Sequence, residues 1–175
     1  MLGKNFLKKE NELGKLEEKL KSLKEISEII KDLKKKGKKV VFANGCFDLL
    51  HGGHISYLEE AKKKGNVLIV AVNSDKSVKL LKGENRPIIP EIDRCEILAA
   101  MWMVDYLFLF DDKTCDNLLM KLKPDVHAKG TDYTKETVPE RETVLSYGGE
   151  IFIAGDPKEN ATKDIIKLIV ERYEE

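Results

Sequence analysis

Apolar and polar residues follow one another along this chain in short blocks whose period changes between that of a helix and that of a strand. Apolar residues through positions 13–33 are separated by steps of three and four, which places them on one face of a helix. Beyond residue 38, short apolar runs alternate with segments in which apolar residues recur at helical spacing. The predicted strands are 39–43, 67–72, 106–110, 126–128 and 151–154. The predicted helices of this part are 54–64, 92–103, 118–122, 138–147 and 162–173.

The predicted strands are mainly apolar and do not alternate between apolar and polar residues. Strands of this kind, separated by helices, are typical of a parallel sheet whose two faces are both covered. We therefore expect an α/β fold: a doubly wound, Rossmann-like, parallel five-stranded sheet with an N-terminal helical extension. Ligands of such sheets bind beyond the carboxyl ends of the strands, so the residues that follow each strand are the first candidates for function.

Charge divides the chain near Gly37. The first 39 residues hold 13 Lys against 7 acidic residues, although the whole chain is balanced at 31 and 31. We expect a helical arm at 1–36 and a more acidic body at 37–175, with no helix-breaking linker between them. The apolar stripe of the arm packs either on the body's own core or on a second copy of the chain. A basic surface for nucleic acid or membrane is the least favoured alternative, because Glu residues interleave with the Lys residues.

Composition excludes several classes of protein. A balanced charge argues against a dedicated nucleic-acid binder, and no apolar run approaches the ~20 residues that cross a bilayer. Cys46, Cys95 and Cys115 are an odd number at wide spacing, which argues against a disulfide framework and against a Cys-rich zinc site. The first residues lack the apolar stretch of a signal peptide. We expect a cytoplasmic protein with no nucleic-acid and no membrane partner.

The turn after the first predicted strand carries the strongest chemical signal. Gly45 allows a ligand to approach the backbone closely, and the helix that follows offers free amide groups and a positive dipole end to an anion. His51 and His54, two of only three histidines in the chain, would add donors from the same side. Phosphate binding is the favoured interpretation. The alternative, half of a metal site, lacks a third ligand cluster, so we assign no metal ligands.

The pattern Gly45-x-Phe-Asp-x-x-His-x-Gly-His54 resembles the signature of the cytidylyltransferase-like nucleotidyltransferases. Members of that superfamily join a nucleoside triphosphate to a phosphate-bearing acceptor and release pyrophosphate. Further motifs follow in order: Asn44-Gly-Cys-Phe-Asp48, Ala71-Val-Asn-Ser-Asp75, Leu81-Lys-Gly-x-x-Arg-Pro87 and Lys129-Gly-x-Asp-Tyr133. This set is similar to the nucleotidyltransferase domain of the ADP-heptose synthesis proteins, over residues 25–170. The resemblance implies adenylylation of D-glycero-β-D-manno-heptose 1-phosphate, on the route to the lipopolysaccharide inner core.

The resemblance also implies roles for individual residues. The expected catalytic residues, which act on phosphate, are His51, His54, Lys82 and Lys129. The expected nucleotide-binding residues are Asn44, Gly45, Cys46, Phe47, His51, Gly53, His54, Gly130, Asp132, Tyr133 and Thr162. The expected ligands of the acceptor phosphate are Lys82, Arg86 and Arg94, of which Lys82 and Arg86 are predicted in a polar loop. Asp48 is expected to orient the turn.

The implied substrates are ATP and a sugar 1-phosphate, with Mg²⁺ bridging phosphates and water, and a homodimer is expected. Two departures from the family pattern stand out. Ala161-Thr-Lys163 replaces the Ser-Thr-Thr of relatives, which removes one hydroxyl. A length of 175 residues leaves no room for the sugar-kinase domain that many relatives carry, so we expect a separate kinase to supply the substrate.

Three alternatives remain at this stage. Two lie within the superfamily: cytidylyl transfer to glycerol 3-phosphate and adenylyl transfer to flavin mononucleotide. The third is a non-catalytic nucleotide-binding module that uses the arm to dock a partner. Cys46 lacks a paired base and is interpreted as structural. His127 is interpreted as a buried histidine with satisfied hydrogen bonds, although its place before Lys129 keeps an active-site role open.

Overall fold

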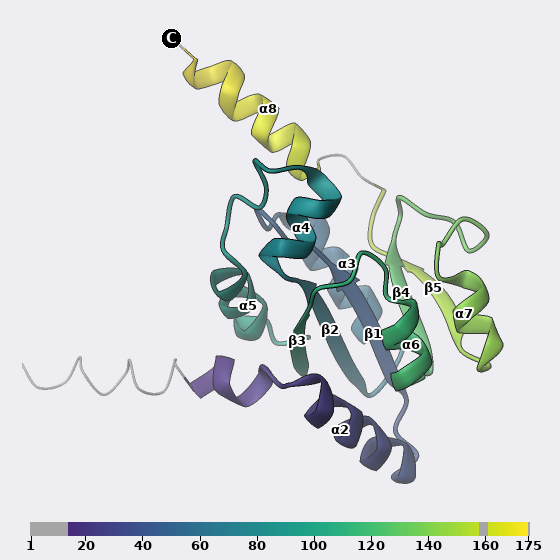
Figure 1. Ribbon diagram of the computed structural model, residues 1–175. Helices are drawn as coiled ribbons and strands as arrows, with labels where there is room; N and C mark the ends of the chain where they lie inside the picture. The colour runs from purple at the N-terminus through teal and green to yellow at the C-terminus, as the bar shows by residue number, and fades with distance from the viewer. Residues whose placement is uncertain (1–13, 158–160, 175) are drawn as a thin grey trace, which may run out of the picture.

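The computed structural model describes residues 14–157 and 161–174. Five strands form one parallel sheet in the order β3-β2-β1-β4-β5, as Figure 1 shows. Their bounds are β1 Val40–Gly45, β2 Val67–Asn73, β3 Tyr106–Phe110, β4 Val126–Gly130 and β5 Glu150–Ala154. The doubly wound fold expected from the sequence is therefore confirmed. The strand order reverses direction between β1 and β4, which is where such a sheet opens a crevice.

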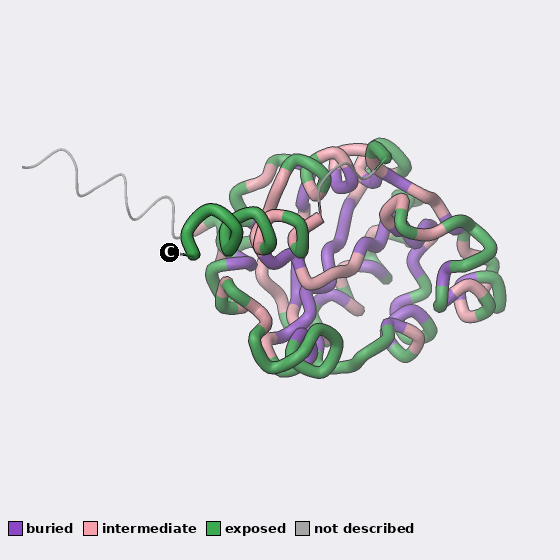
Figure 2. The backbone as a smooth tube through the Cα atoms, turned by 90° about the horizontal axis from the view of Figure 1, so that it is seen from above, coloured by how far each residue is buried: buried purple, intermediate pink, exposed green. Residues whose placement is uncertain are grey.

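Helices cover both faces of the sheet, and each face has its own apolar core. On one face lie α3 (Gly52–Lys62) and α5 (Glu91–Ala100). On the other face lie α2 (Leu23–Lys35), α6 (Asp116–Leu122) and α7 (Arg141–Ser146). Seen from above, the buried strands run through the middle of the molecule with exposed helices around them (Figure 2). This layering explains why the strand sequences do not alternate between apolar and polar residues.

The arm does not form the single long helix that its spacing predicts. Residues 14–19 are helical, then the chain extends for three residues before α2 begins. Leu20 makes an isolated parallel bridge to Leu107 of β3, and Ser22 caps α2 in a reciprocal capping box with Glu25. Ile26 and Ile30 of α2 are buried against the sheet. The stripe of α2 thus packs on the body's own core, whereas the boundary between arm and body at residue 37 stays a prediction.

Two further segments differ from the sequence prediction. Lys82, expected in a polar loop, is instead the last residue of helix α4 (Asp75–Lys82). Ser74 is its N-cap and accepts a hydrogen bond from the Ser77 amide at 3.2 Å. Ser74 at the N-cap, followed by Asp75 in the first turn, was the sequence signal for this helix. The helix predicted at 138–147 begins only at Arg141, because Val138 is buried in the turn before it.

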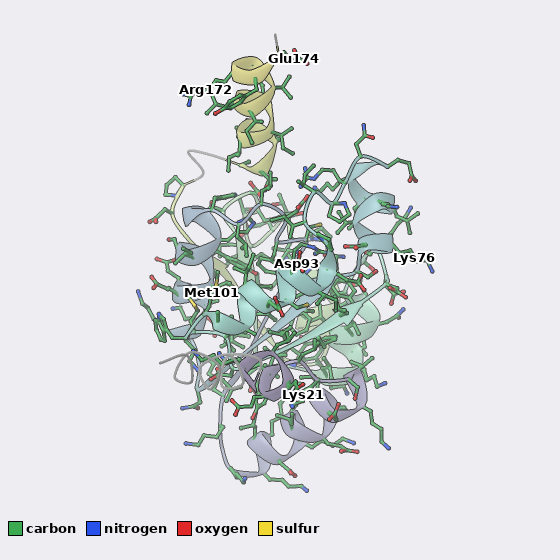
Figure 3. All side chains as sticks on the ribbon, turned by 90° about the vertical axis from the view of Figure 1, so that its left-hand side faces the viewer. Lys21, Lys76, Asp93, Met101, Arg172 and Glu174 are labelled. Carbon is green, nitrogen blue, oxygen red and sulfur yellow. The ribbon has the colours of Figure 1, made fainter. Side chains whose placement is uncertain are left out.

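Helix α8 (Thr162–Tyr173) leaves the body at the top of Figure 1. None of its residues is buried, and Leu168, Ile169 and Val170 are each more than two-fifths exposed. Figure 3 shows Arg172 and Glu174 at the far end of this helix, away from the sheet. Over the described ranges 14–157 and 161–174, no helix combines the length and the apolar character needed to cross a membrane.

Candidate functional site

The turn between β1 and α3 adopts an unusual backbone. Phe47 and Leu49 both have positive φ angles, 51° and 47°, which cost about 1–3 kcal/mol each for residues other than glycine. Such strain persists where surrounding contacts fix the backbone, and it is concentrated at functional sites. The Phe47 ring packs 5.6 Å from the His54 ring, and a side chain at Gly45 would meet the Phe47 ring at 3.2 Å. The turn is therefore held in one shape at the carboxyl end of β1.

His51 and His54 lie side by side at the start of α3, with ring centroids 4.1 Å apart. His51 is the N-cap residue, and its Nδ1 accepts a hydrogen bond from the Gly53 amide at 3.2 Å. The Nδ1 of His54 accepts one from the His51 amide at 3.3 Å. Because each Nδ1 is an acceptor, each neutral ring carries its hydrogen on Nε2. Both Nε2–H groups therefore belong to rings at a helix N-terminus, where backbone amides and the dipole favour an anion.

Asp48 anchors the following loop, residues 83–90, to this turn. Its buried carboxylate accepts hydrogen bonds from the backbone amides of Ile88 and Ile89 and from Arg86 Nε at 2.5 Å. Burial acts to raise the pKa of Asp48, but the two amides and the Arg86 charge outweigh it and hold that pKa below its usual range. The carboxylate is thus ionised at neutral pH. The orienting role expected of Asp48 stays a prediction.

Arg94 is fully buried rather than facing the crevice. Its guanidinium donates to the carbonyl of Cys46, to the carbonyl of Ile89 at 3.0 Å and to Asp75 Oδ1 at 2.8 Å. It therefore joins the strained turn, the loop 83–90 and the start of α4. The structure places Arg94 as a brace of the backbone instead of the predicted ligand of an acceptor phosphate. Arg86 is likewise engaged, through its ion pair with Asp48.

Lys82 and Cys46 lie near one another beside the turn. Lys82 is the last residue of α4 and is exposed to solvent. Burial raises the pKa of the Cys46 thiol, although the charges of Lys82 and Arg94 oppose this effect. Cys46 is therefore a neutral thiol at pH 7, which agrees with its interpretation as structural rather than nucleophilic.

Lys129 lies on the other face of the sheet from α3. Its ammonium is 3.2 Å from Glu140 Oε2, just before α7, and 5.0 Å from the centre of the Tyr133 ring. Tyr133 belongs to a tight turn after β4, in which its amide donates to the Gly130 carbonyl at 3.1 Å, and Asp132 of the same turn is exposed. The structure thus separates Lys129 from the histidine pair. Sequence reasoning missed Glu140, because nothing local marks it as the partner of a strand residue.

Thr162 links helix α8 to the turn. Its hydroxyl donates to the backbone carbonyl of Asp48 at 2.8 Å. The N-terminus of α8 therefore lies beside the strained turn that precedes α3. The predicted site residues accordingly fall into two groups. One group surrounds the turn, and the other follows β4, where the Lys129 side chain lies on the face of the sheet opposite α3.

Another polar contact, beneath the turn, involves the third histidine. His127 of β4 is fully buried, and its Nε2 lies 3.1 Å from Asn44 Oδ1 on β1. The prediction of a satisfied histidine holds for only one ring nitrogen, since His127 Nδ1 has no hydrogen-bond partner. Among the described residues, no group of three or more His, Cys, Asp or Glu side chains could hold a metal ion.

Comparison with known proteins identifies a family and several relatives that are similar to this chain. Residues 42–165 match the family described as Cytidylyltransferase-like. The chain is 45% identical to the Bifunctional protein HldE of Pelobacter propionicus over 155 residues, 89% of this chain and 32% of that protein. It is 47% identical to the Bifunctional protein HldE of Geobacter metallireducens over 157 residues, 90% of this chain and 32% of that one. The chain thus spans about a third of the length of these relatives.

Two solved structures are also similar. The lipopolysaccharide core biosynthesis protein of Thermoplasma volcanium shares 30% identity with a TM-score of 0.60, covering 70% of this chain and all of that one. The pantoate-beta-alanine ligase of Francisella tularensis, complexed with beta-gamma ATP and beta-alanine, has a TM-score of 0.56 at 18% identity, over 82% and 68% of the two chains. At that identity the second likeness concerns the fold alone.

Proposed function

Because this chain belongs to the cytidylyltransferase-like family, we propose that it transfers AMP from ATP to D-glycero-β-D-manno-heptose 1-phosphate, releasing pyrophosphate and forming ADP-heptose for lipopolysaccharide core synthesis. The observation that carries the proposal is the pair of Nε2–H donors on His51 and His54 at the start of α3. The assignment of heptose 1-phosphate as the substrate rests on the sequence motifs, with support from the HldE relatives and from the name of the Thermoplasma protein.

The proposed reaction is a single displacement at phosphorus. A phosphate oxygen of the sugar attacks the α-phosphorus of ATP, a new O–P bond forms, and the bond to the β-phosphate oxygen breaks. The attacking phosphate is already ionised near neutral pH, so no general base is needed. Two anions must nevertheless be brought together, and positioning and charge stabilisation therefore carry the catalysis. His51 and His54 donate to phosphate oxygens of ATP, where charge develops.

Other residues are assigned by where they lie. Lys82, exposed beside the turn, is proposed to attract the acceptor phosphate. Thr162 is proposed to face a phosphate from the start of α8. Arg94 and Asp48 position the turn and the loop 83–90 rather than bind substrate. Lys129, paired with Glu140, is proposed to hold the turn at Gly130–Tyr133 against the nucleotide.

Mg²⁺ is proposed to accompany ATP, coordinated by phosphate oxygens and water. When bound, the ion neutralises phosphate charge. Because ATP is a cytoplasmic substrate, we also propose that the protein acts in the cytoplasm.

A homodimer remains part of the proposal. The stripe of α2 is used in the body's own core, but α8 exposes Leu168, Ile169 and Val170 to solvent. Exposed apolar side chains grouped on one element are typical of an interaction surface. Sedimentation velocity is expected to give twice the mass of the 19.9 kDa chain. A species of the single-chain mass at micromolar concentration would contradict this.

The function is tested by pyrophosphate release with Mg²⁺, using ATP or CTP against each of three acceptors. These are the β anomer of the heptose 1-phosphate, glycerol 3-phosphate and flavin mononucleotide. Release with only ATP and the heptose phosphate is the expected result. Fast release with another pair would keep the chemistry and discard the heptose. Nucleotide binding without release in any arm would indicate a binding module instead of an enzyme.

A further inference from the structure

His127 is a buried polar residue that packing alone does not explain. It lies on β4 with no exposed surface, in register with Ile151 of β5 and beside the Phe42 ring. Its Nδ1 has no hydrogen-bond partner. A buried nitrogen without a partner lowers stability, and an aliphatic side chain would avoid that cost. An unsatisfied polar group kept in a core therefore requires a reason other than packing.

The contact with Asn44 fixes the state of both side chains. Asn44 Oδ1 can only accept, so the hydrogen of the imidazole is assigned to Nε2, which donates across the 3.1 Å contact. Burial, with the nearby Lys129 charge, lowers the pKa of His127 to about 3, and the ring is neutral at physiological pH. Because Oδ1 of Asn44 faces His127, its amide group, Nδ2, is turned away from the histidine.

The orientation of the Asn44 carboxamide matters because of where Asn44 lies in the sheet. It precedes Gly45 at the carboxyl end of β1, and the strand order reverses between β1 and β4. Asn44 is partly exposed there, whereas His127 lies below it in the core. We propose that His127 is a positioning residue, which holds the Asn44 carboxamide so that Nδ2–H donates to an acceptor atom of the bound nucleoside triphosphate. This inference rests on the proposed function.

The test compares two substitutions of His127 with different chemistry. His127→Leu removes the donor together with the unpartnered Nδ1. We expect its melting temperature to be unchanged or higher, while KM for ATP rises about tenfold or more and kcat changes less. His127→Gln keeps an amide donor near the place of Nε2 and is expected to recover KM to within about threefold. In the His127→Leu background, Asn44→Ala should add little, because the two residues act as one unit.

A matched control separates positioning from structure. Ile151→Ala opens a cavity in the same layer, beside His127. It is expected to lower the melting temperature and to leave KM for ATP unchanged. If the His127 variants instead lose activity in proportion to their loss of stability, as a purely structural residue would, the positioning role is overturned.

The role of His127 can be tested even if the wild type does not catalyse the proposed reaction. Binding of ATP by calorimetry replaces KM when no acceptor supports turnover in the wild type, and the same tenfold loss in His127→Leu is expected. The nitrogen chemical shifts of the His127 ring should report the Nε2–H tautomer. Normal ATP affinity in His127→Leu, or an Nδ1–H tautomer in the wild type, overturns the inference even where wild-type turnover with heptose phosphate is fast.

Discussion

His54→Ala and His51→Ala should each lower kcat by about 100- to 1000-fold, the usual loss when one donor to a developing anion is removed. Each ring is held by a backbone amide at Nδ1, so the pre-oriented Nε2–H is the group that each substitution deletes. Steady-state pyrophosphate release at saturating ATP and acceptor measures the effect. Turnover within a few-fold of wild type in both variants would remove the phosphate role from the pair.

The helix start provides a control for this experiment. His51 is also the N-cap of α3, so His51→Ala should lose about 1 kcal/mol of stability in addition to activity. Asn is among the best N-cap residues. His51→Asn should therefore keep the stability of the wild type and still lose kcat. If the kcat of His51→Asn equals that of the wild type, His51 serves to cap α3 and does not contact phosphate.

Asp48→Asn should lower the free energy of unfolding by about 3–5 kcal/mol, the range for breaking one side of a buried ion pair. Asn presents a donor where Arg86 and two amides all donate, so at least one buried donor loses its partner. The loop 83–90 should loosen, and KM for the acceptor should rise more than KM for ATP. Urea denaturation and initial rates measure the two effects.

The same substitution should flatten the acid side of the stability profile. The pKa of Asp48 is lowered in the folded state, so its contribution is complete above the unfolded pKa of about 3.9 and is lost as pH falls through the folded value. Wild type should therefore lose more stability than Asp48→Asn over this interval. Asp112→Asn, at an exposed loop carboxylate, is the control and should stay within about 0.5 kcal/mol of wild type. An equal slope in wild type and Asp48→Asn would contradict the assignment.

The sheet and its covering helices could be predicted because a buried parallel strand is recognisable from a local run of apolar residues. β2, for example, is apolar at six consecutive positions before Asn73. The break in the arm could not be found by spacing alone. Leu20 fits the apolar stripe of a continuous helix, but it pairs with Leu107 of β3 instead, and such a long-range contact leaves no local signal.

The candidate site was predictable where its residues lie close together in sequence. His51 and His54 are three residues apart at a helix start, and local geometry fixes their tautomers. The contacts of Arg94 could not be predicted, because a basic residue near a crevice has the same sequence signature whether it binds substrate or backbone. Its three partners come from segments up to 48 residues away. The pairing of His127 with Asn44 spans 83 residues and is likewise visible only in the fold.

On the proposal that the acceptor binds beside the loop 83–90, the way Asp48 holds this loop bears on how acceptor choice can evolve. Two of its contacts go to the backbone amides of Ile88 and Ile89, which every residue except proline provides. Ile88 is 52% exposed as a residue, and its side chain takes no part in that anchor. Selection can therefore change side chains on the loop without releasing it. A library randomised at Glu84, Asn85 and Ile88 would explore new acceptors on a scaffold whose position is already secured.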